Sequence, residues 1–366
     1  MRHSISSAFD LKANPTMTKV TVHWISLLVI FVLSITPPSA CHAFEFKFPW
    51  ETSKPNTPFS KVDAKALRPG DTIAVVGASG NVGKLVALRL SDTYKVNGIV
   101  RNAASVMPFF EGREDRIKLF EADLLDETSN LKNPNECPAS LLPALQNANA
   151  IVICTGTTAF PTKAWTKSGE SEVANDVIQA LLKNSLNVKN AISSLDAQGL
   201  NTPNNVDAKA NAMLVQAWNA AAKVSQKRII MLSSIGVQRR ETMPFPILNA
   251  CGVLDGKAAG EEAISDAAKQ GGYSYTIIRP GQLFGGPYDN NYYLGTLFQL
   301  DKDVATQDVS VGQGDTLLGD TLRSTLAEVT AQICEGDCAR DLDFAVINVK
   351  GDAPTTEVVQ ERLKAL

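Results

Sequence analysis

The chain has 366 residues, and its 35 Lys and Arg against 38 Asp and Glu give a formal net charge of −3. This balance offers no basic excess for binding nucleic acid. The only histidines are His3, His23 and His42, so the chain after residue 43 has none. That absence excludes Ser-His-Asp catalysis, Cys-His catalysis and His-ligated metals there. We expect no metal site, because Cys334 and Cys338 stand without a second cysteine pair.

Residues 1–43 are typical of a signal peptide. Basic residues precede an apolar run over residues 20–35, and small residues follow at 39–43. The run is shorter than the roughly 20 residues that a membrane span needs. An uncleaved membrane anchor is the alternative interpretation.

Cleavage after Ala43 would leave Phe44 at the start of a segment rich in Ser, Thr, Pro and Lys, over residues 44–69. A signal peptide followed by a Phe-led segment resembles the two-part presequence of algae with secondary plastids. The resemblance implies a plastid (chloroplast) destination, and the secretory pathway is the alternative. Five cysteines remain after residue 43, and an odd number suits reduced thiols better than a disulfide framework.

From residue 70 to residue 366, apolar strand patterns alternate with helical patterns. Strands are predicted over residues 73–76, 95–100, 116–121, 150–154, 228–232, 275–278 and 344–349. Helices are predicted over residues 82–90, 103–111, 141–147, 207–223, 257–269 and 325–333. Repeated units of this kind predict an α/β fold with a doubly wound parallel sheet, the NAD(P)-binding Rossmann fold. We expect a single domain with a small C-terminal region for substrate or a partner.

A glycine turn with the spacing G-x-x-G-x-x-G joins the first strand to the first helix, at Gly77, Gly80 and Gly83. Glycines let backbone N–H groups approach phosphates, and the helix N-terminus adds a partial positive charge. The pattern predicts a dinucleotide-binding turn, with a turn that holds no ligand as the alternative. A P-loop is excluded, because Ala78 replaces its first glycine and Leu85 replaces its Ser or Thr.

Arg101 follows the second predicted strand, where an NAD-binding protein usually has Asp or Glu for the ribose hydroxyls. An arginine there suits a 2′-phosphate, so we predict NADP(H) as the cofactor. A charge-assisted bond of about 1.5–3 kcal/mol corresponds to a preference of about tenfold to hundredfold. A solvated surface arginine is the alternative.

Seven segments between about residues 70 and 290 read, in order, VVGASGNVG, IVRN, ADLLD, VICTGTTAFPTKAW, RIIMLSSIGV, LDGKAAGEEAI and YTIIRPGQL. Together they resemble the atypical short-chain dehydrogenase/reductases, specifically the NmrA-like NAD(P)-binding proteins of plastids and cyanobacteria. The resemblance implies a set of cofactor-binding residues. These are Gly77, Ser79, Gly80, Asn81, Val82 and Gly83 for the pyrophosphate, Arg101 for the 2′-phosphate, Asp123 and Leu124 for adenine, Thr155 and Gly156 for the ribose, and Lys257, Pro280 and Gly281 near the nicotinamide.

The chain departs from the family at its catalytic motif. Active members carry Tyr-x-x-x-Lys, whereas this chain has Lys257 but Val253 at the tyrosine position. Lys257 and Ser234 are therefore candidate catalytic residues without their tyrosine, with Ser233 as the other match to the helper serine. A helix-surface lysine and a strand-end turn are the structural alternatives for these positions.

Two functions follow from this departure. The first is an NADP(H)-binding protein with a cofactor-binding, redox-sensing or partner-docking role in the plastid, where a plastid protein would be its partner. The second is an NADPH-dependent oxidoreductase of a small plastid metabolite that uses another proton donor. Residues 163–204 exceed the family's usual length, and we interpret them as a lid, a partner surface or a mobile loop with a helix over 170–183.

Overall fold

The computed structural model describes residues 66–131, 133, 135–168, 173–285 and 306–366. The predicted signal peptide and most of the segment 44–69 lie outside these residues. No helix in the described ranges is both long enough and apolar enough to cross a membrane.

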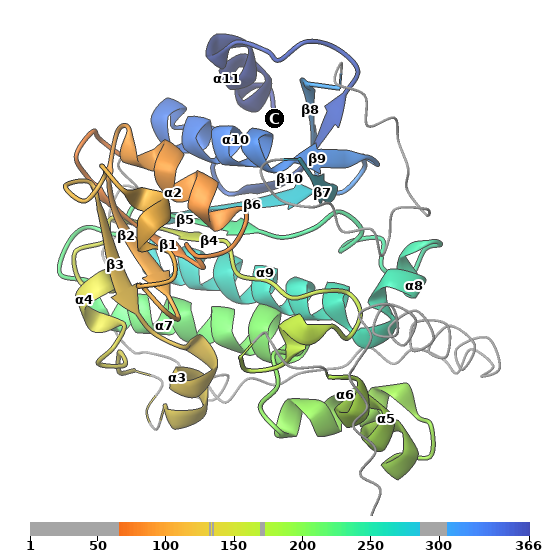
Figure 1. Cartoon of the computed structure of the whole chain (residues 1–366). Coiled ribbons are helices and arrows are strands. Elements are labelled where there is room, and N and C mark those ends of the chain that lie inside the picture. The colour runs from red at the N-terminus through yellow and green to blue at the C-terminus, as the bar shows by residue number, and fades with distance from the viewer. Residues whose placement is uncertain (1–65, 132, 134, 169–172, 286–305) are drawn as a thin grey trace, which may run out of the picture.

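An eight-stranded sheet forms the centre of the molecule, in the order β3-β2-β1-β4-β5-β6-β10-β8 (Figure 1). All neighbouring strands pair in parallel except β8, which runs antiparallel to β10 at one edge. The strands are β1 Thr72–Val76, β2 Lys95–Val100, β3 Ile117–Glu121, β4 Ala150–Ile153, β5 Arg228–Leu232, β6 Ser274–Pro280, β8 Asp308–Gln313 and β10 Leu342–Val349. This is the predicted doubly wound α/β fold.

Helices cover both faces of the sheet, which explains why the central strands β1 and β4 are apolar along nearly their whole length. Ile73 and Val75 of β1 pack on one face, and Ala74 and Val76 pack on the other. One face carries α2 Gly83–Ser91, α10 Arg323–Gly336 and α11 Thr356–Lys364 (Figure 1). The other face carries α4 Leu142–Leu145, α7 Asn211–Ala221 and α9 Val253–Gly271.

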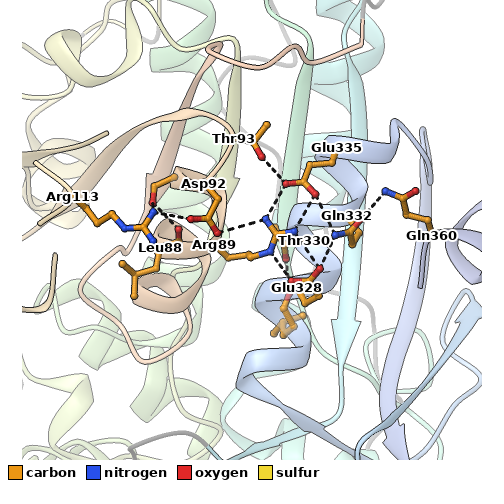
Figure 2. A network of polar contacts seen from close by, with 12 residues as sticks. Leu88, Arg89, Asp92, Thr93, Arg113, Glu328, Thr330, Gln332, Glu335 and Gln360 are labelled. Atoms are coloured by element: carbon orange, nitrogen blue, oxygen red, sulfur yellow. Dashed lines mark hydrogen bonds and ion pairs between the residues drawn. The ribbon is translucent and has the colours of Figure 1, made fainter. Parts of the chain in front are cut away.

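A network of charges holds α2 against α10. Arg89 of α2 donates from Nε to Glu328 at 2.6 Å and from Nη1 to Glu335 at 2.9 Å (Figure 2). Hydrogen bonds to both carboxylates raise the pKa of Arg89. Gln332 also donates to Glu328, so the network extends along α10 (Figure 2). These contacts fix α2, the helix that follows the glycine turn.

Two short strands, β7 Gln282–Phe284 and β9 Asp320–Leu322, form a separate two-stranded sheet next to the C-terminal end of β6. The other two strands of residues 306–366, β8 and β10, instead extend the main sheet, and α10 and α11 cover one of its faces. The C-terminal region is therefore largely built into the central domain.

Residues 163–204 contain two packed helices, α5 Ala174–Lys183 and α6 Val188–Ala197. Trp165, Val177, Leu181 and Leu195 form a small apolar core between them and the neighbouring chain. The helix predicted over 170–183 begins at residue 174 in the structure, and residues 169–172 lie outside the described ranges.

Several predicted boundaries were wrong. The helix expected over 103–111 is only a 3₁₀ turn over Met107–Phe110, because Pro108 interrupts the helical pattern. The single helix expected over 207–223 starts as a π-helix over Asn204–Ala210 and continues as α7. The strand expected over 275–278 runs on to residue 280. The helices α3 Leu124–Asn130, α6, α8 Phe245–Leu248 and α11, and the strands β7, β8 and β9, were not predicted.

Candidate functional site

The glycine turn lies where the strand order reverses, between β1 and β4, which is where open α/β sheets bind their ligands. Gly77 has a φ of +78°, a left-handed conformation that favours glycine. A Cβ on Gly77 would lie 3.0 Å from Thr155 Cγ2, and this close approach places the turn against the end of β4.

The third glycine of the turn brings α2 close to the end of β1. A Cβ on Gly83 would lie 2.1 Å from the carbonyl oxygen of Gly77, so only glycine fits there. The backbone N–H of Gly80 donates to the same oxygen at 2.9 Å and closes the turn. The N-cap residue of α2, Val82, makes no side-chain hydrogen bond to the helix, and Gly80 and Asn81 are exposed. This geometry fits a dinucleotide pyrophosphate at the start of α2.

Arg101 is exposed directly after β2, and its Nη1 donates to the carbonyl oxygen of Lys167 at 2.8 Å. Asp123 caps α3, because its Oδ1 accepts the backbone N–H of Leu125 at 2.9 Å. Leu124 is half-buried against the apolar core. We call the turn at residues 77–83, together with Arg101 and Asp123, the phosphate side of the site.

Lys257 lies in a buried ion pair and not on a helix surface. Its Nζ is 2.9 Å from Oδ1 of Asp207, and the two residues are 8 % and 0 % exposed. The other oxygen of Asp207 accepts the backbone N–H of Thr157 at 3.3 Å. Burial raises the pKa of Asp207, and the charge of Lys257 opposes that shift. Sequence reasoning missed Asp207, which it placed inside an ordinary helix.

The π-helix over residues 204–210 brings Asp207 to Lys257. A Cβ on Gly256 would lie 2.7 Å from the carbonyl oxygen of Pro203, and one on Gly260 would lie 2.3 Å from that of Asp207. The backbones of the π-helix and α9 therefore touch where only glycine fits. Single-turn π segments occur often at functional sites, because they redirect side chains within a helix.

The strand end after β4 links this pair to the glycine turn. A Cβ on Gly156 would lie 3.2 Å from Lys257 Nζ, and Gly77 is packed on Thr155 as described above. The structure therefore brings together the turn, Thr155, Gly156 and Lys257 at one edge of the sheet.

Val253, at the position of the family's tyrosine, is only 5 % exposed. Its side chain belongs to an apolar cluster with Val237, Phe245 and Leu254. Asp207 is the hydrogen-bond partner of Lys257 Nζ among the described residues. We call Asp207, Lys257 and Val253 the lysine side of the site.

The two serines after β5 have other partners. Ser233 Oγ donates to Glu261 at 2.5 Å, and Glu261 is paired with Arg279 at 2.6 Å. Ser234 Oγ donates to the carbonyl oxygen of Ile235 at 3.0 Å. Neither serine hydroxyl has Lys257 as its hydrogen-bond partner in this structure.

Pro280 ends β6, and Gly281 follows in a tight backbone contact. A Cβ on Gly281 would lie 1.9 Å from the carbonyl oxygen of Gly319. The N–H of Gly281 also donates to Thr321 Oγ1 at 2.8 Å. Gly281 therefore has a structural role, because it joins the two-stranded sheet to β6.

Within the described ranges, no group of three or more His, Cys, Asp or Glu residues could hold a metal ion.

A solved structure that is similar to this chain supports the fold. A protein described as an NAD-dependent epimerase/dehydratase, from Bacillus halodurans, has a TM-score of 0.50 and 18% identity, and the match covers 80% of this chain and 100% of that one. The oxidoreductase ylbE from Lactococcus lactis has a TM-score of 0.49 and 18% identity, covering 81% and 96%. A short-chain dehydrogenase/reductase from Veillonella parvula, in complex with NADP, has a TM-score of 0.44 and 13% identity, covering 78% and 99%.

No curated protein matches the sequence. The family model described as NAD(P)H-binding, however, matches residues 77–333, a span that begins at the first glycine of the turn and ends within α10. The match covers more than half of the chain, and the protein therefore belongs to the NAD(P)H-binding family.

Proposed function

We propose that this protein binds NADP(H) and has a cofactor-binding, redox-sensing or partner-docking role in the plastid, and is not a turnover enzyme. The observation that carries this proposal is the lysine side of the site. Lys257 is held by the buried carboxylate of Asp207, and Val253 packs into an apolar cluster where a proton-transferring tyrosine would stand. The phosphate side keeps the glycine contacts that a dinucleotide requires.

NADP(H) is proposed over NAD(H) because of Arg101. The residue is exposed at the end of β2, the position that faces the adenosine ribose in this fold. A guanidinium there would bind a 2′-phosphate through charge-assisted hydrogen bonds, worth about 1.5–3 kcal/mol.

Titration of the protein with NADPH and with NADH, followed by nucleotide fluorescence, tests the cofactor assignment. We expect NADPH to bind about tenfold to hundredfold more tightly. Arg101→Asp should remove that preference and leave NADH binding in place. An unchanged ratio of the two affinities would contradict the assignment.

Stopped-flow absorbance at the NADPH band, with a panel of quinones and enones, tests the absence of turnover. We expect binding of NADPH without its oxidation. Rapid oxidation that is lost in Lys257→Ala would overturn the binding function in favour of catalysis.

The alternative function is an NADPH-dependent oxidoreductase acting on a small plastid metabolite. It is supported by the position of Lys257, whose Nζ lies beside Gly156 at the end of β4. In that case Lys257 would donate the proton that accompanies hydride transfer and would be reprotonated from water, and Asp207 would orient its ammonium group.

A partner-docking role is supported by α5. Ile178, Leu182 and Leu186 expose 37, 67 and 47 % of their surfaces on or just after that helix, which is more than a packed helix face shows.

The plastid destination rests on residues 1–69. A fluorescent protein fused to these residues should reach the plastid of an alga with secondary plastids. Phe44→Ala should stop it before the plastid, whereas secretion of the unaltered fusion would contradict this destination.

A further inference from the structure

Residues 163–167 reach the phosphate side of the site. The carbonyl oxygen of Lys167 accepts a hydrogen bond from Arg101 Nη1 at 2.8 Å. The Nζ of Lys167 lies 3.5 Å from Oδ1 of Asp126 in α3, and these two side chains are 65 and 62 % exposed. The side chain of Arg101 therefore contacts the backbone of Lys167 beyond the end of β2, although the two residues come from segments far apart in the sequence.

The segment that carries Lys167 is held in place at several points. Trp165 is fully buried, and its Nε1 donates to the carbonyl oxygen of Thr158 at 3.2 Å. The side-chain amide of Asn201 donates to the carbonyl oxygens of Thr166 at 2.7 Å and Ala164 at 3.1 Å. The backbone of Lys167 is thus fixed by its neighbours, while its side chain extends into solvent.

We propose that Lys167 is a specificity-determining residue that supplies, with Arg101, the second cation of a 2′-phosphate site. The inference rests on the proposed NADP(H) binding and extends it to Lys167. A guanidinium has five N–H donors, and the hydrogen bond to Lys167 uses one of them. The others can bind a phosphate while that bond keeps the guanidinium oriented.

The charges at this place favour a phosphate over a ribose hydroxyl. A phosphate monoester carries a charge of about −1.5 to −2 at neutral pH, so two cations match it better than one. The ion pair between Lys167 and Asp126 is exposed, so exchanging it for a phosphate contact costs little.

The test is titration of the full chain with NADPH and NADH for the wild type, Lys167→Ala, Lys167→Arg and Lys183→Ala. Lys183 is the matched control, because it is an exposed lysine of the same inserted segment on α5. We expect Lys167→Ala to raise the dissociation constant for NADPH by about fivefold to tenfold and to leave that for NADH unchanged. Lys167→Arg should keep the preference, and Lys183→Ala should match the wild type.

A second readout is the salt dependence of NADPH binding, which should be weaker in Lys167→Ala because one screened charge contact is gone. If Lys167→Ala weakens both nucleotides equally or neither, the inference is overturned. If Arg101→Ala abolishes the NADPH preference while Lys167→Ala does not, the inference fails and the proposed function stands. If the wild type binds neither nucleotide, the proposed function fails, and the inference fails with it.

Discussion

The phosphate side and the lysine side meet at the end of β4, yet they are built in opposite ways. On the phosphate side, Gly80, Asn81 and Arg101 are exposed, and the turn keeps glycines where a side chain would clash. On the lysine side, Asp207, Lys257 and Val253 are buried, and both charges are already paired. One side is ready for a ligand, whereas the other has satisfied its polar groups internally. Cofactor binding and cofactor chemistry can therefore be separated in this fold.

The largest effect is expected from Asp207→Ala, which leaves the ammonium group of Lys257 buried without a counter-charge. Removing one partner of a buried pair costs about 3–5 kcal/mol of the free energy of unfolding. Chemical denaturation measures the loss. The matched control is Asp126→Ala, which breaks an exposed lysine pair and should cost less than about 1 kcal/mol. The double variant Asp207→Leu, Lys257→Met should recover most of the lost free energy of unfolding. If the double variant is as unstable as Asp207→Ala, the unpaired buried charge is not the cause of the loss.

The next effect concerns the phosphate side, where Gly83→Ala should cost about 2–3 kcal/mol of stability and weaken NADPH binding roughly hundredfold. Its Cβ would lie 2.1 Å from the carbonyl oxygen of Gly77, so α2 must move away from the turn. Gly80→Ala is the matched control, because its Cβ would lie 3.2 Å from the same oxygen and should therefore cost less stability. Thermal unfolding and NADPH titration together separate the two variants. Equal stability losses would mean that the contact between Gly77 and Gly83 is not tight.

Sequence reasoning succeeded where the determining pattern is local. The strands over 95–100 and 228–232 were predicted to the residue. In the second of them, a continuous apolar run over residues 229–232 marks a buried parallel strand. The glycine turn is likewise local, with its strand, three glycines and helix within residues 71–90. The family match over residues 77–333 confirms NAD(P)H binding, while the preference for NADP(H) and the contacts of each site residue stay predictions.

Sequence reasoning failed where distant segments decide the structure. Asp207 and Lys257 are 50 positions apart, and no local pattern pairs them. The π-helix that carries Asp207 depends on Gly256 and Gly260 in α9, where a Cβ would meet its backbone. The helix predicted over residues 207–223 carries several polar residues, and its sequence alone does not indicate that Asp207 is the one paired with Lys257.

Val253→Tyr tests whether the missing tyrosine is the only reason that the protein would bind NADPH without oxidising it. The added ring would overpack the cluster of Val237, Phe245 and Leu254 and cost about 1–3 kcal/mol of stability. We expect no NADPH oxidation with the quinone and enone panel, because Asp207 still holds Lys257. Adding Asp207→Asn to the same variant frees the lysine and provides the comparison. Turnover by Val253→Tyr alone would show that the ion pair does not block chemistry.

The smallest effect separates two roles of Asp123 on the phosphate side. Its carboxylate caps α3 through the N–H of Leu125, so Asp123→Ala should cost about 1 kcal/mol of stability, and the resulting shift of Leu124 should weaken NADPH binding a few-fold. Asparagine caps helices as well as aspartate does, so Asp123→Asn should keep both stability and affinity. Both quantities come from thermal unfolding and NADPH titration of the same samples. If Asp123→Asn keeps its stability but binds NADPH as weakly as Asp123→Ala, the carboxylate itself contacts the cofactor, because the cap would then be intact in the variant that lost affinity.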